Sequence, residues 1–163
     1  MNINDFKGAY KSLARPTRFR VYGFGADRQL EFMCKGAQIP GSQIGTIEVP
    51  YMGRKIKEAG DRTYTEWTIT VINDISFNLH EYFEKWLEKI NHPVANIGSG
   101  NPLEYKEDGF VDQLDMNGEV VATYQLIGAF PIEVSPIELS WESTDSIEEF
   151  TVNFAYDWHE RIK

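Results

Sequence analysis

The amino-acid sequence predicts a mainly β (α+β) fold, an antiparallel β-sandwich or partly closed barrel with one main α-helix at about residues 76–91 and a long loop at about residues 39–62. Segments with the period-2 alternation of strands outnumber helical segments. Most links between them have hairpin character, and no strand–helix–strand repetition of the kind that builds a parallel sheet occurs. With 163 residues, 42% of them hydrophobic and 25% charged, the chain is expected to form one domain over residues 1–163.

The first elements are predicted to be a short helix and a β-hairpin. Residues 2–13 space their apolar side chains as a helix does and end before Pro16, since a residue before proline avoids the helical region. Residues 18–24 and 29–36 flank the turn-forming GADR, which indicates two paired strands. The apolar side of the helix would hold Ile3, Phe6, Tyr10 and Leu13.

The loop at residues 39–62 is interrupted repeatedly by proline and glycine and holds one short strand-like stretch, TIEV. An irregular segment of this length is unusual in a compact domain and is commonly functional or stabilised by a partner. Mixed charges crowd around Gly53 and Gly60, so this part is not core, and both a solvent loop and a docking loop fit it. The charged residues are Arg54, Lys55, Lys57, Glu58, Asp61 and Arg62.

A half-buried strand and the main helix follow this loop. Over residues 64–72, apolar side chains from Trp67 to Val71 alternate with threonines. The next stretch, NDISFNLHEYFEKWLEKINHP, repeats apolar residues at helical spacing, with Ser76 or Asn78 as the expected N-cap. The apolar side chains of this helix are Leu79, Phe83, Trp86, Leu87 and Ile90.

The C-terminal part is predicted to contain four further strands. Residues 110–131 read as a long hairpin around Asn117-Gly118, a dipeptide suited to a type I′ turn. Residues 137–143 and 147–158 indicate two more strands, separated by the turn-forming STDS. These links favour an antiparallel arrangement.

The formal charge of −9 argues against a protein that binds nucleic acid over its whole surface, because phosphate binding needs clustered Lys and Arg. The charges are unevenly distributed. Residues 1–30 hold six basic and two acidic residues, whereas residues 101–160 hold fourteen acidic residues and one base, Lys106. Two interpretations stay open: copies of the chain meet through opposite charges, or the asymmetry has no function.

The sequence indicates neither a membrane segment nor a catalytic site. No apolar run approaches the length that crosses a bilayer, and the N-terminus lacks the apolar region of a signal peptide, so we expect a protein made in a cytoplasm. Cys34, the single cysteine, is expected to be a buried structural thiol. His80, His92 and His159 lack partners at metal-ligand spacing, and no nucleotide-binding or nucleophile motif occurs. We therefore expect no catalytic residue, no metal, no cofactor and no enzyme activity.

Four segments, in order along the chain, carry a family resemblance: LEFMCKGAQIPG, GRKIKEAGDRTYTEWTITVIND with the FEKW that follows, PLEYKEDG and IEEFTVNFAYDW. Together they resemble the tail tube protein of T4-like contractile bacteriophages, the myovirus tail tube family. The matches cover most of the chain, and the charged run beginning at Gly53 is highly specific. The first dozen residues and residues 94–100 carry little of the pattern.

The resemblance implies a structural virion protein in which six subunits form a ring and rings stack into the hollow inner tube of a contractile tail. The tube would be the conduit for DNA ejection into the host, with DNA passing the lumen without specific binding and no membrane insertion by this chain. We expect few Lys or Arg side chains on the lumen wall, because a basic wall would bind phosphates. The implied partners are further copies of the chain, the tail sheath protein, the baseplate initiator, the tape measure protein and the tail terminator protein.

The resemblance also implies a role for the long charged loop, which in this family reaches toward neighbouring subunits and the next ring. The candidate contact residues are therefore Arg54, Lys55, Lys57, Glu58, Asp61 and Arg62. The implied location is the tail tube of a virion that is assembled in the host cytoplasm. Alternatives within the same architecture are a baseplate protein that initiates the tube and the tube of a phage-derived secretion or injection system. From a different class, a monomeric ligand-binding β-sandwich or a hydrolase with dispersed catalytic residues stays open.

Overall fold

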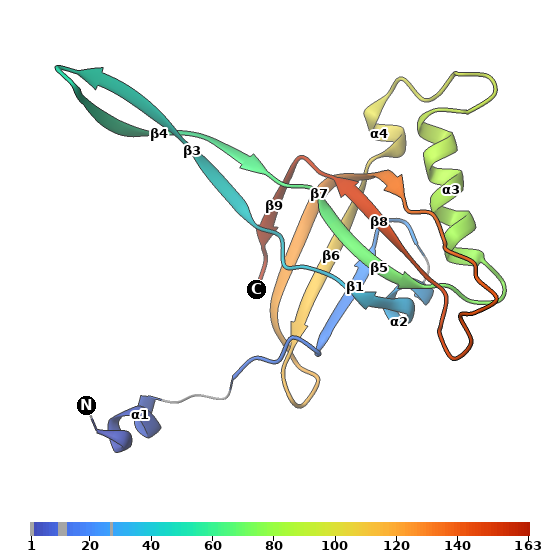
Figure 1. Ribbon diagram of the computed structural model, residues 1–163, viewed down its shortest axis with the longest axis horizontal. Coiled ribbons are helices and arrows are strands. Elements are labelled where there is room, and N and C mark those ends of the chain that lie inside the picture. The colour runs from blue at the N-terminus through green and yellow to red at the C-terminus, as the bar shows by residue number, and fades with distance from the viewer. Residues whose placement is uncertain (1, 10–12, 27) are drawn as a thin grey trace.

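The computed structural model describes residues 2–9, 13–26 and 28–163, and those residues form nine strands and four helices (Figure 1). Only one helix, α3, is longer than seven residues in this part of the chain. In chain order the elements are α1 (Ile3–Ala9), β1 (Phe19–Gly23), α2 (Gln29–Met33), β2 (Cys34–Gly36), β3 (Ser42–Tyr51), β4 (Arg54–Tyr64), β5 (Trp67–Ile72), α3 (Asn78–Ile90), α4 (Pro102–Tyr105), β6 (Glu107–Leu114), β7 (Val120–Val134), β8 (Glu149–Ala155) and β9 (Trp158–Arg161).

Seven of these strands form one antiparallel sheet, which confirms the predicted mainly β class with a single main helix. The strand order is β1-β6-β7-β8-β5-β2, and β9 also pairs with β7. β7 joins the two halves of the sheet, because its first part pairs with β6 and β9 and its last part pairs with β8. A register shift between Pro131 and Glu133 marks the bend, as a bulge does. The bent sheet is nearly closed and barrel-like (Figure 1).

The core lies between the concave side of this sheet and helix α3. The strand Trp67–Ile72 buries every second side chain, as its alternation predicts. Helix α3 contributes Leu79, Phe83 and Trp86, so the predicted helix and its apolar side are confirmed. The expected N-cap is wrong, since Phe77 occupies that position with a left-handed φ of 55° and no side-chain cap bond.

The predicted hairpin of residues 18–24 and 29–36 is wrong. β1 pairs with β6, and residues 29–33 form the short helix α2, which buries Leu30. β2 pairs with β5 on the opposite end of the sheet. These short segments take their partners from strands far away in the sequence, which a local turn signal does not reveal.

The N-terminal helix is confirmed over Ile3–Ala9, where none of the described side chains is buried. Of its expected apolar side, Tyr10 lies outside the described residues, and Leu13 lies beyond the helix. Ile3 and Phe6 are exposed, so this helix does not contribute to the core. Figure 1 shows α1 lying apart from the barrel.

The hairpin predicted at residues 110–131 is confirmed as β6 and β7, but its turn is not type I′. Asn117 has no positive φ; Gly118 alone in this turn has one, at 84°. Asp115 Oδ1 accepts hydrogen bonds from the backbone N–H groups of Asn117 and Glu119 and holds the turn instead. Residues 137–143 form no strand, whereas β8 lies where a strand was predicted and β9 adds a short one after it.

Candidate assembly surfaces

The segment expected as an irregular loop at residues 39–62 is a regular β-hairpin, formed by β3 and β4, that extends away from the barrel (Figure 1). Its two-residue turn is made by Met52 and Gly53, which both have left-handed φ values, 45° and 79°. Such a turn matches the twist of the flanking strands. Nearly all residues of both strands are exposed. The hairpin is therefore a regular projection and not an irregular loop.

One face of this hairpin is apolar. β3 places Ile47, Val49 and Tyr51 on this face, and Ile56 of β4 lies opposite Val49. These four side chains are between 47% and 65% exposed. An isolated two-stranded hairpin is marginally stable in water, and an exposed apolar strip marks an interaction surface. This apolar face is the surface of the hairpin that most needs a partner.

The six charged contact candidates all lie on β4, but the structure divides them between two faces. Lys55 and Lys57 lie on the face opposite the apolar strip. Lys55 Nζ donates to Glu48 Oε2 at 2.6 Å, so its charge already has a partner within the hairpin. Arg54 and Glu58 lie beside the apolar side chains. The full set on this strand is Arg54, Lys55, Lys57, Glu58, Asp61 and Arg62.

Sequence reasoning found the charges of the hairpin and missed its apolar strip. The signal was the alternation in TIEVPY, where Ile47, Val49 and Tyr51 are separated by Glu48 and Pro50. Proline inside the run argued against a strand. Here Pro50 is tolerated because β3 has a paired strand on one side only, so the missing N–H breaks no sheet on the other.

An aromatic cluster holds the base of the hairpin against the barrel. The His159 ring lies 5.2 Å from Tyr64 at the end of β4, in edge contact, and 6.1 Å from Tyr156. Tyr124 of β7 completes the cluster. Burial, and then the nearby charge of Arg62, lower the pKa of His159. These contacts tie the position of the hairpin to β7 and β9.

One acidic side chain of the described core, Asp112, is almost fully buried, with 1% exposed. Its Oδ2 accepts hydrogen bonds from Arg20 Nη2 at 2.5 Å and Nε at 3.0 Å, and its Oδ1 accepts from Thr123 Oγ1 at 2.7 Å. Glu31 lies 3.4 Å from the same guanidinium. Both carboxylate oxygens are satisfied, so this group links β1, β6 and β7 as a structural ion pair.

The described ranges show neither a metal-binding cluster nor a membrane-spanning helix. Among these residues, no three His, Cys, Asp or Glu side chains gather into a group that could hold a metal ion. Across residues 2–9, 13–26 and 28–163, no helix is both long and apolar enough to span a membrane.

Comparison with known proteins places the chain in a family. Residues 5–162 match the phage tail tube protein family. The tail tube protein of Enterobacteria phage T4 is 32% identical over 163 residues, which cover 98% of this chain and 100% of that protein. Among solved structures, a chain of the tube-terminating cap of the anti-feeding prophage has a TM-score of 0.73 at 17% identity, covering 93% of this chain and 92% of its own length. A chain of the sheath–tube complex of an extracellular contractile injection system has a TM-score of 0.66 at 16% identity, covering 96% and 95%, so both structures share the fold. On the sequence match along nearly its whole length, this chain belongs to the phage tail tube protein family.

Proposed function

We propose that this chain is the repeating subunit of the inner tube of a contractile phage tail, with six subunits in a ring and rings stacked around a lumen through which DNA is ejected. Membership of the tail tube family supports this function. The observation that carries it is the projecting β3–β4 hairpin, whose exposed apolar face has no partner within the described chain. A contact between this hairpin and the next copy is heterologous, and repeated heterologous contacts build open filaments.

The sheet itself offers edges at which a ring can close. β1 and β2 lie at the two ends of the strand order, and each pairs with one neighbour, β6 and β5. Free strand edges present unpaired backbone groups, and pairing them between subunits removes that liability. A ring of subunits joined edge to edge would form a continuous barrel around the lumen, with a wall poor in Lys and Arg so that DNA slides.

The charged residues of β4 supply the rim of the hairpin contact in this proposal, and its apolar strip supplies the centre. Exposed ion pairs contribute about 0–1 kcal/mol each, and a ring repeats every one of them around its circumference. Because Lys55 is paired with Glu48 in the same hairpin, Lys57, Arg54 and Arg62 have more charge available for acids of adjacent copies. The sheath protein, the baseplate initiator, the tape measure protein and the terminator protein would contact the assembled tube.

The experiment is electron microscopy of the purified chain, concentrated alone and then mixed with baseplates of the parent particle. Hollow filaments of uniform width with sixfold end views are expected. Compact single particles in both conditions would refute the tube proposal and leave a shared fold only. A tube-initiating protein or an injection-system tube has the same architecture, and growth of long filaments from phage baseplates separates the tail tube from the initiator.

Three variants test the hairpin. The double change Val49→Thr with Ile56→Thr keeps strand propensity but replaces the central two of the four apolar side chains, and Lys55→Glu with Lys57→Glu reverses the charge of the opposite face. Both should block filament growth while circular dichroism shows a folded subunit. Gln43→Thr, at an exposed position of the same hairpin, is the matched control and should form normal tubes. Normal tubes from the apolar-strip variant would remove the hairpin from the interface, and normal tubes from the charge-reversed variant would remove the charged face.

A further inference from the structure

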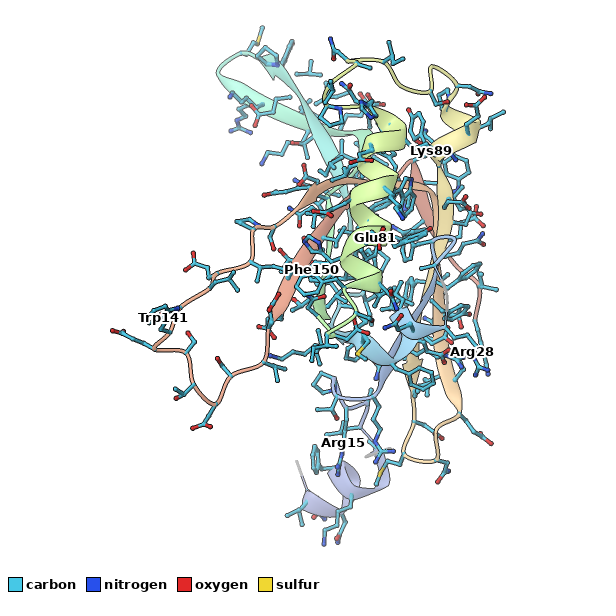
Figure 2. The ribbon with its side chains drawn as sticks, turned by 90° about the vertical axis from the view of Figure 1, so that its right-hand side faces the viewer. Arg15, Arg28, Glu81, Lys89, Trp141 and Phe150 are labelled. Carbon is cyan, nitrogen blue, oxygen red and sulfur yellow. The ribbon has the colours of Figure 1, made fainter. Side chains whose placement is uncertain are left out.

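A second projection of the chain is the loop between β7 and β8, residues 135–148, which stands away from the barrel with Trp141 at its tip (Figure 2). Both ends of the loop are held. The Ser135 N–H donates to the Thr151 carbonyl, and the Asn73 N–H donates to the Glu148 carbonyl. Turn bonds from Ser143 N–H to the Ser140 carbonyl keep the tip in a defined shape.

Trp141 is fully exposed, unlike the other tryptophans of the chain. Trp67, Trp86 and Trp158 each donate their indole N–H to an oxygen atom, whereas the Trp141 indole has no hydrogen-bond partner among the described residues. Leu139 beside it is also exposed, at 83%. A tryptophan that is presented on an anchored loop and left in water is typical of an anchor residue of an interface. The loop also carries only negative charges, from Glu138, Glu142, Asp145 and Glu148.

A groove of matching chemistry lies elsewhere on the same chain, between residues 13–18 and the turn that joins β6 to β7. Arg18 Nη1 donates to the carbonyl oxygens of Asp115 at 3.2 Å and Met116 at 2.6 Å, so its guanidinium ties the two sides of the groove together. Its volume is about 470 Å³. Its apolar wall is formed by Leu13, Leu114, Met116 and Val121.

The groove also carries the charge that the loop needs. Arg15 lines it, and the guanidinium of Arg15 has no ion-pair partner in the described part of the chain. Asp115, the acidic residue in the lining, has its carboxylate turned to the backbone N–H groups of its own turn. In Figure 2, Arg15 lies near α1, whereas Trp141 points away from the barrel on another side, so the loop of one copy faces outward and not toward its own groove.

We propose that the groove receives the Trp141 loop of a second copy of this chain, with the indole against the apolar wall and Glu142 beside Arg15. This inference rests on the proposed tube, which needs two different contacts between copies: one that closes a ring and one that repeats along the axis. The sheet edges and the hairpin serve these two contacts, and the loop and groove add a further contact between copies. Opposite charges on loop and groove set the register of the contact, and the guanidinium gains a further contact with the indole face.

Cysteine cross-linking in assembled tubes tests the contact. Ser143→Cys with Asn117→Cys places one thiol beside Trp141 and one at the groove, and oxidation should link subunits into covalent oligomers. Ser143→Cys with Glu88→Cys, on the exposed part of α3, is the matched control and should stay uncross-linked. Burial raises the pKa of Cys34 to about 12, so little of the native thiol is in the reactive thiolate form.

Assembly of substituted chains gives the second readout. Trp141→Ala should raise the lowest concentration that supports filament growth by about tenfold or more, whereas Trp141→Phe keeps an aromatic anchor and should raise it less than about threefold. Arg15→Glu should also weaken growth, and adding Glu142→Arg to it should restore growth by reversing both charges.

The outcomes separate the two proposals. If the wild-type chain forms no tubes, the proposed function fails. The inference fails, and the tube proposal stands, under three conditions together: wild-type tubes form, the groove pair cross-links no more than the control, and Trp141→Ala assembles normally. The rate of alkylation of the Ser143→Cys thiol gives one more test. A rate that is fast in bare tubes and slow only after sheath binding would show that the loop contacts the sheath, and this result would also overturn the inference.

Discussion

Gly109 of β6 has no room for a side chain, and Gly109→Ala is the sharpest test of how the core is packed. A Cβ at this position would lie 1.9 Å from Phe24 Cζ. Phe24 is fully buried, and its ring packs against the rings of Phe154 and Trp67, with centroid distances of 4.7 Å and 5.5 Å. The added methyl group must therefore push an aromatic ring that has packed neighbours behind it.

The cost follows from this geometry. Overpacking a well-packed core typically costs about 1–3 kcal/mol. Because the ring must move by more than about 1 Å to reach an ordinary contact distance, we expect a loss near the upper end, about 3 kcal/mol. For a chain of this size each kcal/mol lowers the Tm by about 2–4 °C, so the Tm should fall by about 6–12 °C.

Thermal unfolding followed by circular dichroism measures this change. Gly41→Ala is the control, because no atom of the described residues would lie within 4 Å of a Cβ at Gly41. In a double-mutant cycle, Phe24→Leu should relieve part of the clash, so the double variant should lose at least about 1 kcal/mol less than the sum of the single changes. An unchanged Tm for Gly109→Ala, or strictly additive losses, would refute the packing argument.

Two further predictions concern titratable groups. Burial and the charge of Arg62 lower the pKa of His159 below 6.5, so the unfolded chain takes up a proton first as the pH falls. The free energy of unfolding should then decrease as the pH falls through 6.5. Urea titrations at pH 7.5 and 5.5 should show a smaller decrease for His159→Gln than for the wild-type chain. Equal decreases in the two chains would contradict the assignment. Burial raises the pKa of Cys34 to about 12. Iodoacetamide at pH 8 should therefore label the folded chain about tenfold or more slowly than the urea-unfolded chain. Equal labelling rates would show an accessible thiolate in the folded chain.

Local periodicity was a reliable guide where one side of an element is buried. The strand around Ile69 and the helix around Phe83 repeat apolar residues at the spacing of their own backbone, because both present one face to the same core. The hairpin around Gly118 was found from its dipeptide, although the turn type was not, because the Asp115 side chain holds a different geometry there.

The same reasoning failed for the projecting hairpin. Residues 42–64 are mostly exposed, and Pro50 and Gly53 indicate breaks that mask the short alternation around Ile47. The family resemblance indicated its charged residues as contact candidates. It did not show that Ile47 and Ile56 lie on the apolar face of the hairpin, whereas Lys55 and Lys57 lie on the opposite face. Only the register of β3 against β4 decides which of these side chains share a face.

By itself the sequence determined the mainly β class, the main helix, the charge asymmetry and the family, because each of these is written in neighbouring residues or in motif order. The tertiary structure decided what depends on residues far apart. It paired β1 with β6 and β2 with β5, turned Arg20 toward Asp112, and placed the groove beside Arg15 and the Trp141 loop on different sides of the barrel. Long-range pairing has no local signal, since the free energy of a strand depends on the surface that it meets.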